Sequence, residues 1–489
     1  EWDAAKCIQC NNCAFVCSHA TIRPYLLSEA EEKAAPAGLV AVDTKPKAGQ
    51  YKYTMSVSPL DCMGCGECVT VCPTAAIKMV PQETRLAEQP VWDYLVKNVS
   101  KKADSGYADS TVKGSQFNQP LLEFSGSCAG CAETSYARLI TQLFGENMYI
   151  SNATGCSSIW GGPAATCPYT INKDSKKGPA WANSLFEDNA EHGLGMYVGQ
   201  KFIRDSLIAK LNEIAASEKA SDSLKAAIAK FMETKDSTIE NQEPTKALIA
   251  ELEKLDCSCK DEILEKKAYL NKKSVWIMGG DGWAYDIGFG GLDHVLASGE
   301  NVNVMVFDTE MYSNTGGQAS KASNIGEVCQ FAAAGKDISK KSLAEIAMSY
   351  GYVYVAQIAL GANPAQALKA IQEAEAYNGP SLIIGYAPCE LHGVKGGMNH
   401  CQDEMKAAVK AGYWNLFSYN PALKAEGKNP FTLTSKEGDG SYQAFLANET
   451  RYSSLTRKFP ERAEFLFKKN EEVAKARFEH LQRLVELYK

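Results

Sequence analysis

The stretch from Gly279 to Gln318 decides the fold class of this chain. It reads Gly279-Gly-Asp-Gly-Trp283, then the apolar run Val302-Asn-Val-Met-Val-Phe307, then Asp308-Thr-Glu-Met-Tyr-Ser-Asn-Thr-Gly-Gly-Gln318. A further apolar run, Val275-Trp-Ile-Met278, comes directly before it. Short apolar and β-branched runs that end in turn or polar residues are typical of buried parallel strands. The sequence therefore predicts an α/β fold with a mostly parallel sheet.

Asp281 and Thr309 each follow one of these predicted strands. In an open α/β sheet the ligand crevice lies at the carboxyl ends of the strands, so the two side chains are expected to face each other. A carboxylate, a hydroxyl and a backbone carbonyl are hard oxygen ligands that suit Mg²⁺ carrying a diphosphate, and glycines let the backbone come close. The alternative is an ordinary turn at Asp281 with Asn314 as a loop residue. The matching position of the two strands favours the metal site.

Length and composition set broad limits on the function. The chain has 489 residues, 45% of them hydrophobic, and a net charge of -7 with both signs spread along it. Three domains of ordinary size are expected, and no nucleic-acid partner is indicated. No run of eighteen apolar residues occurs, so no membrane span is expected. The first residue is Glu1, which we interpret as a cut from a longer polypeptide. The 17 cysteines are odd in number and clustered, which favours thiolate ligation in the reducing cytoplasm over disulfides.

Two cysteine runs of identical spacing dominate the first eighty residues. They are Cys7-x2-Cys10-x2-Cys13-x3-Cys17 and Cys62-x2-Cys65-x2-Cys68-x3-Cys72-Pro. This is the bacterial ferredoxin pattern, in which the fourth cysteine of each run binds the other cluster. We therefore expect one 4Fe-4S cluster on Cys7, Cys10, Cys13 and Cys72, and a second on Cys62, Cys65, Cys68 and Cys17. Zinc is the competing interpretation, but zinc pairs are normally separated by a long loop.

Other features of this region are interpreted as ordinary structure. The first run is followed by Ser18 and His19, whereas the second is followed by Pro73. His19 is expected to be an exposed loop residue or a hydrogen-bond partner of the cluster. The polar segment 28–50 is expected to be a surface insertion. Residues 101–120 have few apolar positions and no clear period, so they are interpreted as a linker.

Further cysteines follow predicted strand ends. Cys156 comes after Met148-Tyr-Ile150, and Cys389 comes after Ser381-Leu-Ile-Ile-Gly-Tyr386. If these strands share one parallel sheet, both cysteines reach the edge that carries Asp281, and Cys128 and Cys131 could complete a third set of four thiolates. Taken singly, Cys156 or Cys389 is better explained as a small buried hydrophobe, but the convergence at one edge favours the ligand interpretation. The ordinary interpretation is kept for the remaining cysteines, namely Cys167, Cys257, Cys259, Cys329 and Cys401.

Helical periodicity marks two more regions. Residues 200–272 are rich in Ala, Lys, Glu and Leu, with apolar positions at helical spacing, and are expected to form an inserted group of helices. Residues 461–489 show the same spacing and predict a terminal helix. The expected organisation is a two-cluster ferredoxin-like α+β domain at 1–100, the linker at 101–120, a cofactor and metal domain at 121–420, and an extension at 421–489. His192 is expected to be structural.

Taken together, these motifs resemble the carboxyl-terminal portion of single-chain pyruvate:ferredoxin oxidoreductases. Besides the two cysteine runs, the resemblance rests on Gly126-Ser-Cys-Ala-Gly-Cys-Ala-Glu-Thr, Asn152-Ala-Thr-Gly-Cys-Ser-Ser-Ile-Trp, Gly280-Asp-Gly-Trp-Ala-Tyr-Asp, the segment from Asp308 to Gln318, and Ala387-Pro-Cys389. Gly280-Asp-Gly with the later Asn314 resembles the thiamine diphosphate motif. The resemblance implies a thiamine diphosphate-binding fold preceded by the ferredoxin-like domain.

The resemblance also implies the cofactors and the residues that contact them. A third 4Fe-4S cluster would lie beside thiamine on Cys128, Cys131, Cys156 and Cys389. Mg²⁺ would be bound by Asp281, Thr309 and the Met311 carbonyl, and Asn314 would lie near the 2-oxo acid as the catalytic residue. The residues expected to contact thiamine diphosphate are Glu133, Cys156, Gly280, Asp281, Gly282, Trp283, Thr309, Glu310, Met311, Tyr312, Ser313 and Asn314.

The implied activity is oxidative decarboxylation of pyruvate with coenzyme A to acetyl-CoA. Electrons would pass through three clusters to ferredoxin or flavodoxin. Further active-site residues would come from N-terminal domains of the same polypeptide, and a homodimer is expected. Two alternatives stay open, namely another 2-oxo acid as substrate and an electron-transfer subunit without substrate chemistry.

Overall fold

A parallel β-sheet forms the centre of the molecule. The computed structural model describes residues 1–162 and 166–489, and its main sheet has 8 strands in the order β13-β12-β10-β11-β7-β6-β4-β5. Neighbouring strands from β10 to β5 run parallel, and β12 and β13 are added antiparallel at one edge. The strands are β4 (Met148–Ala153), β5 (Ala180–Ser184), β6 (Ser274–Gly280), β7 (Asn303–Asp308), β10 (Tyr354–Ile358), β11 (Ser381–Tyr386), β12 (Phe417–Tyr419) and β13 (Phe431–Leu433). The predicted mostly parallel sheet is confirmed.

Burial explains why these runs are strands in the middle of the fold. Every residue of β7 and β11 is buried, and β6 is buried except at Gly280. Strands covered on both faces read as continuous apolar runs rather than alternating ones. The register pairs Asp308 with Tyr386 and Phe307 with Gly280, so the carboxyl ends of β11, β7 and β6 lie level.

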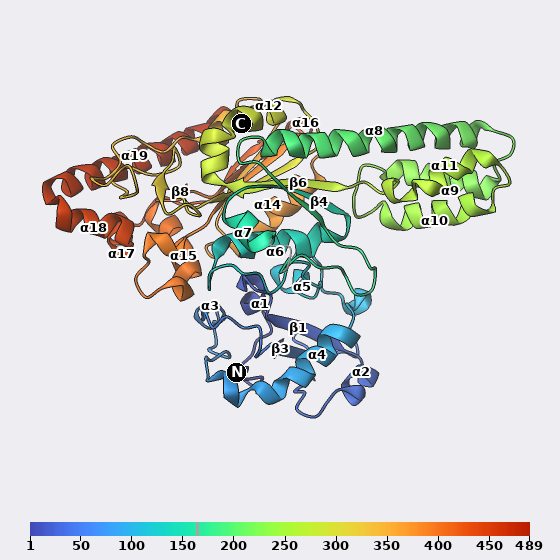
Figure 1. Cartoon of the computed structure of the whole chain (residues 1–489), viewed down its shortest axis with the longest axis horizontal. Helices are drawn as coiled ribbons and strands as arrows, with labels where there is room; N and C mark the ends of the chain where they lie inside the picture. Colours follow the sequence, from blue (N-terminus) through green and yellow to red (C-terminus); the bar gives the residue numbers. More distant parts are fainter. Residues whose placement is uncertain (163–165) are drawn as a thin grey trace.

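Helices cover the sheet and join its strands (Figure 1). α8 packs against β4 and β6, and α14 packs against β10 and β11. On α6, the Tyr136 hydroxyl donates to the Tyr386 carbonyl at 2.9 Å, and Phe144 stacks on Trp276. These helices are α6 (Ala132–Phe144), α7 (Cys156–Gly161), α8 (Asn189–Ala216), α12 (Phe289–Ala297), α13 (Leu343–Met348), α14 (Pro364–Ala376) and α15 (Cys401–Ala411).

The first hundred residues form a small α+β unit at one end of the molecule, shown in blue in Figure 1. Its sheet has the order β1-β3-β2, all antiparallel, and its cysteine runs lie around two short helices, α1 and α3. The elements are α1 (Asn12–Val16), β1 (Ile22–Leu27), α2 (Glu29–Ala34), β2 (Val42–Asp43), β3 (Lys52–Val57), α3 (Glu67–Thr70) and α4 (Gln89–Asn98).

The segment expected to be a linker is folded onto its neighbours. It contains α5 (Val112–Ser115), and Tyr107 stacks on Phe117 with ring centroids 5.4 Å apart. The Asn11 side chain donates to the Lys113 carbonyl at 2.9 Å. Residues 101–120 are therefore a packed connection, because two aromatic residues supply the apolar contacts that composition alone understated.

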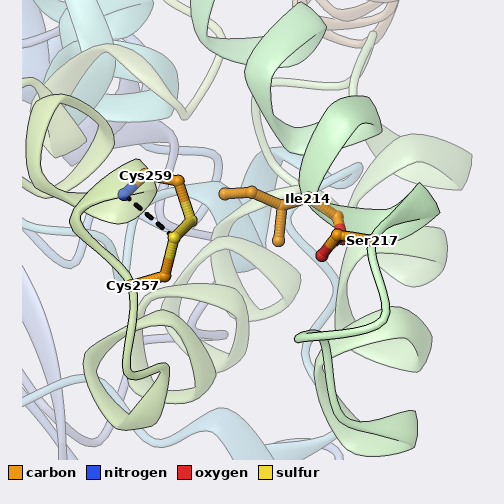
Figure 2. The surroundings of a disulfide bond; sticks show 4 residues. All are labelled: Ile214, Ser217, Cys257 and Cys259. Atoms are coloured by element: carbon orange, nitrogen blue, oxygen red, sulfur yellow. Dashed lines mark hydrogen bonds between the residues drawn. A yellow bond between two sulfur atoms is a disulfide. The ribbon is translucent and has the colours of Figure 1, made fainter.

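Residues 189–265 form a helical arm that projects from the sheet (Figure 1). After the long α8 come α9 (Asp222–Thr234), α10 (Gln242–Lys254) and α11 (Asp261–Glu265), which share an apolar cluster of their own. The arm contains a disulfide between Cys257 and Cys259, near Ile214 of α8 and Ser217, which follows the end of that helix (Figure 2). Our expectation of ordinary free cysteines was wrong for this pair, because the turn after α10 brings their Cα atoms to 5.2 Å. The other cysteines are free.

The carboxyl-terminal part consists of helices that pack beside the sheet. They are α16 (Ala422–Ala425), α17 (Tyr442–Asn448), α18 (Thr450–Lys458) and α19 (Pro460–Leu487). α19 contacts β13, α17 and α18, so the predicted terminal helix is confirmed and its apolar side is used in packing. Among the described residues, no helix has the length and apolar character that crossing a membrane requires.

Candidate functional site

Four neighbouring parallel strands deliver the chemically active residues to one edge of the sheet. β4, β6, β7 and β11 are adjacent, and the chain leaves their carboxyl ends at Gly155-Cys156, Asp281, Thr309 and Cys389 respectively. The expected convergence at a single edge is confirmed. A further short hairpin, β8 (Met311–Tyr312) with β9 (Gln318–Ala319), folds the segment after β7 back over this edge.

Three oxygen atoms gather around Thr309. Its hydroxyl oxygen lies 2.9 Å from Asp281 Oδ1 and 3.0 Å from the Met311 carbonyl, and its single proton is donated to one of these two acceptors. Its backbone N–H donates to Asp281 Oδ1 at 3.1 Å, and the Ser320 hydroxyl donates to Asp281 Oδ2 at 2.9 Å. The carboxylate and the carbonyl that were predicted to bind Mg²⁺ therefore both lie within hydrogen-bond distance of the third predicted ligand, the Thr309 hydroxyl.

The electrostatics of Asp281 fit a cation. The residue is 1% exposed, and its direct partners are hydroxyl and amide groups rather than a base. Burial raises the pKa of Asp281 well above its usual range, and the nearby Asp308 raises it further. A buried carboxylate is costly unless a positive charge accompanies it. All three candidate ligands are hard oxygens, as Mg²⁺ prefers, so the residues present fit this ion.

A cavity of about 270 Å³ opens beside these oxygens. It is lined by eleven of the twelve residues expected to contact thiamine diphosphate, including Glu133, Cys156 and Asn314. Gly282 is required here, since an added Cβ would lie 2.7 Å from the Tyr312 ring. The lining residues that the sequence did not indicate are Thr154, Gly155, Ser157, Phe186 and Thr315. Phe186 lies in a segment without a motif and reaches the cavity by contact with Tyr312.

Glu310 is the exception among the expected cofactor contacts. Its side chain is fully buried behind the cavity wall, where Asn324 donates to it at 2.7 Å and Lys340 lies 3.1 Å away. Glu310 has a φ of 63°, in the left-handed region, so its side chain leaves the loop in a direction different from those of its neighbours. Glu310 is therefore the one predicted cofactor-contact residue that does not line the cavity.

Glu133 is a buried acid in the wall of the cavity. Trp160 Nε1 donates to its Oε2 at 3.1 Å, and burial raises the pKa of Glu133 to about 7. The carboxyl therefore exchanges its proton near neutral pH. Cys131 is the N-cap of α6, and Glu133 lies in the first turn of this helix.

Cys156, which lines this cavity, belongs to a group with Cys128, Cys131 and Cys389. Burial raises the pKa of Cys389 to about 11, and Glu133 and Cys128 contribute. Burial also raises the pKa of Cys156, with Glu133, Cys389, Cys131 and Cys128 acting in the same direction. These mutual influences indicate that the four cysteines are neighbours, and a cation would favour their thiolate forms. The donor set suits a cubane.

The two ferredoxin-type runs form two separate sulfur groups. The pKa of the Cys10 thiol is raised by Cys7 and Cys72, whereas the pKa of the Cys68 thiol is raised by Cys17, Cys65 and Cys62. The fourth cysteine of each run therefore lies with the other run, as the spacing rule requires. The second group lines a cavity of about 230 Å³. Among the described residues, no three His, Cys, Asp or Glu side chains are close enough to bind one metal ion. A cubane needs a wider spacing, because each of its four thiolates binds a different iron atom.

His19 is not an exposed loop residue, so that part of our expectation was wrong. It is 2% exposed, and its two ring nitrogens lie 3.1 Å from the hydroxyls of Ser18 and Ser127. It thus joins the ferredoxin-like unit to the segment that precedes Cys128. His192 is structural as expected, with Nδ1 at 2.7 Å from the Ser151 hydroxyl.

A buried ionic network contacts the loop after β7, which carries the predicted Mg²⁺ ligands Thr309 and Met311. No sequence motif indicated this network. Arg451, 3% exposed, lies 2.9 Å from Glu310, 2.7 Å from Glu449 and 3.3 Å from Glu327. Burial acts to raise the pKa of Glu310, but Lys340 and Arg451 outweigh it and bring it to about 2. The network therefore ties α18 to the loop that carries Thr309 and Met311.

Replacing Arg451 with methionine is expected to lower the free energy of unfolding by about 3–5 kcal/mol, because buried carboxylates would lose their partner. Denaturant unfolding followed by circular dichroism measures this change. Arg462→Met is the matched control, since Arg462 is partly exposed and pairs with the exposed Asp337, and a surface pair contributes about 0–1 kcal/mol. Equal losses in the two variants would contradict the importance of the buried network.

Comparison with known proteins agrees with the class that the fold and site define. Residues 6–76 match the family model "4Fe-4S dicluster domain", and residues 265–384 match "Thiamine pyrophosphate enzyme, C-terminal TPP binding domain". The chain therefore combines a two-cluster iron–sulfur domain with a thiamine diphosphate-binding domain. The matched ranges include both cysteine runs and the entire segment from Gly279 to Gln318.

The relatives narrow this class. The chain is 52% identical to pyruvate:ferredoxin oxidoreductase of Moorella thermoacetica and 51% identical to pyruvate-flavodoxin oxidoreductase of Klebsiella pneumoniae, over 99% of its own length and 42% and 41% of theirs. It is 46% identical to a mitochondrial pyruvate dehydrogenase [NADP(+)] of Euglena gracilis, over 99% of its length and 27% of that protein. The chain is thus homologous, along nearly all its length, to part of the pyruvate:ferredoxin and pyruvate-flavodoxin oxidoreductases. It spans about two fifths of their length.

Proposed function

We propose that this chain is the cofactor and electron-transfer part of an enzyme that oxidatively decarboxylates pyruvate with coenzyme A. Thiamine diphosphate and Mg²⁺ occupy the cavity beside Asp281. Three 4Fe-4S clusters, on the three groups of four cysteines, carry electrons to ferredoxin or flavodoxin. The choice of pyruvate as substrate and of ferredoxin or flavodoxin as acceptor rests on the names of the relatives, which are longer than this chain.

One observation supports this proposal more than any other, namely that the cavity and the third sulfur group share a wall. Cys156 lines the cavity, and its thiolate is affected by Cys128, Cys131 and Cys389. Glu133 also lines the cavity and acts on the same thiolates. A cofactor that releases electrons would therefore lie directly beside a group that accepts them.

The residues of this chain have distinct tasks in the proposed reaction. Asp281, Thr309 and the Met311 carbonyl hold the divalent cation that carries the diphosphate. Trp283 and Phe186 supply apolar walls that exclude water, and the exposed Asn314 faces the part of the cavity where a 2-oxo acid would enter. When bound, thiamine diphosphate supplies the electron sink that loss of carbon dioxide requires. No side-chain nucleophile is needed.

The remaining parts of the proposal concern the whole enzyme. The missing length of the relatives corresponds to further domains of the same polypeptide, which contribute the rest of the active site. A cytoplasmic homodimer completes the proposal. The three groups of four cysteine ligands support a reducing environment, because cysteine ligands must stay reduced.

Single-turnover reduction of the clusters tests the substrate. In the complete enzyme that contains this chain, pyruvate is expected to bleach the iron–sulfur absorption faster than 2-oxobutyrate or 2-oxoglutarate does, at equal concentration and with coenzyme A present. Stopped-flow absorbance follows the reaction, and dithionite reduction provides the full amplitude as a control. Fastest reduction by 2-oxoglutarate would replace pyruvate as the substrate. Reduction by none of the acids, in a protein without thiamine diphosphate, would indicate an electron-transfer subunit.

A further inference from the structure

Helix α6 physically connects two of the sulfur groups. Its N-cap is Cys131, of the group beside the cofactor cavity. One turn further, the Ser135 hydroxyl donates to the Val16 carbonyl at 2.9 Å, and Arg138 NH2 donates to the Phe15 carbonyl at 2.5 Å. The residue after Val16 is Cys17, which belongs to the group with Cys62, Cys65 and Cys68. Arg138 therefore lies about 10 Å along the helix from Cys131, at 1.5 Å per residue, and beside the backbone that leads to Cys17.

Arg138 is a buried cation without an acidic partner. It is 1% exposed, and its NH1 donates to the side-chain oxygens of Gln142 at 2.8 Å and Gln116 at 3.2 Å. Its Nε has no hydrogen-bond partner. Among the described residues no carboxylate lies within ion-pair distance of the guanidinium. Buried charges are normally paired, since desolvating an ion costs several kcal/mol.

The negative charge that most strongly stabilises the Arg138 cation belongs to a predicted cluster ligand, Cys17. Burial lowers the pKa of Arg138, and the strongest influence in the opposite direction is the thiolate of Cys17, followed by Glu67. A 4Fe-4S cluster with four thiolates is an anion, and taking up one electron makes it more negative. A fixed cation in a buried site interacts more strongly with the reduced cluster than with the oxidised one, because low dielectric strengthens Coulomb interactions.

We propose that Arg138 raises the reduction potential of the cluster on Cys17, Cys62, Cys65 and Cys68. This inference rests on the proposed function, because it takes the clusters as present. Arg138 acts through the electrostatic field of its guanidinium group and does not bind iron. The cation favours arrival of each electron at this cluster from the cofactor side, and the electron that leaves it for the next acceptor restores the oxidised charge. The same helix that holds Cys131 thus sets the electrostatics of the next cluster.

A redox titration followed by electron paramagnetic resonance tests this role. In the cluster-loaded complete enzyme, Arg138→Gln is expected to shift one of the three midpoint potentials to a more negative value and to leave the other two nearly unchanged. Arg138→Lys keeps the charge and is expected to stay close to the wild-type value. Equal shifts in the two variants would assign Arg138 a purely structural role and overturn the inference.

A second variant covers the case in which Arg138→Gln fails to load its clusters. Gln142→Glu places a carboxylate against the guanidinium, which neutralises it and keeps its contact with position 142. The variant loses the Gln142 Nε2 hydrogen bond to the Asn118 carbonyl, and it is expected to shift the same potential negatively. Arg204→Gln is the remote control, since Arg204 also donates to backbone carbonyls but lies on the helical arm. Three unmoved potentials in Gln142→Glu overturn the inference even if pyruvate is oxidised. The titration uses no 2-oxo acid, so a wrong substrate leaves its result intact.

Discussion

Asp281→Asn is expected to abolish Mg²⁺-dependent binding of thiamine diphosphate. Asparagine keeps the shape of the side chain and an Oδ1 that accepts from Thr309, but it removes the only carboxylate among the three candidate ligands. A diphosphate then meets no bridging cation. Activity falls to background because the cofactor is absent, although the two outer sulfur groups are untouched.

Thermal unfolding and equilibrium dialysis measure this loss together. In the wild type, a ligand at about one hundred times its Kd adds about 2.7 kcal/mol of stability, which appears as a higher Tm. Asp281→Asn should show no such increase, while its cofactor-free Tm stays at or above the wild-type value, because a buried carboxylate without a cation is itself costly. Asp293→Asn on α12 is the matched control. Full cofactor occupancy in Asp281→Asn would remove this residue from the metal site.

Much of the site could be predicted from the sequence because its ligands sit in short motifs. Each cysteine run is defined by spacing, and Asp281, Thr309 and Cys389 each follow an apolar strand. Parallel strands have their carboxyl ends at one edge, so the position of a residue just after a strand is enough to place it. For this reason Cys156 and Cys389 could be placed at the same sheet edge although they are far apart in the sequence.

Other features were not accessible because they depend on contacts between distant segments. Arg451 meets Glu310 across 141 positions, and neither residue belongs to a pattern with the other. Glu310 illustrates the limit well, since it lies inside the motif but its backbone conformation turns the side chain away from the cavity. His19 was expected at the surface because its partner Ser127 comes more than one hundred residues later. Composition likewise concealed the packing of residues 101–120.

Cys401 is the cysteine that most complicates the ligand assignment. It is fully buried at the start of α15, and Glu67, Cys131, Cys389 and Cys65 all contribute, after burial, to raising its pKa. It therefore lies between the second and third sulfur groups. Cys389 is the better fourth ligand for the third group, because it follows β11 at the same sheet edge as Cys156 and Asp281. Its thiolate is also affected by Cys128.

Cys389→Ser is accordingly expected to remove about one third of the bound iron and to stop electron flow from pyruvate, since one of three clusters loses a thiolate. Iron and sulfide analysis, with electron paramagnetic resonance of the dithionite-reduced protein, should show the signals of the two ferredoxin-type clusters intact. Cys401→Ser is the matched control, because it removes an equally buried thiol from the same region and should retain the full iron content. If Cys401→Ser loses iron and Cys389→Ser does not, the fourth ligand is Cys401, and the electron route then leaves the cofactor edge through α15 instead of through the loop after β11.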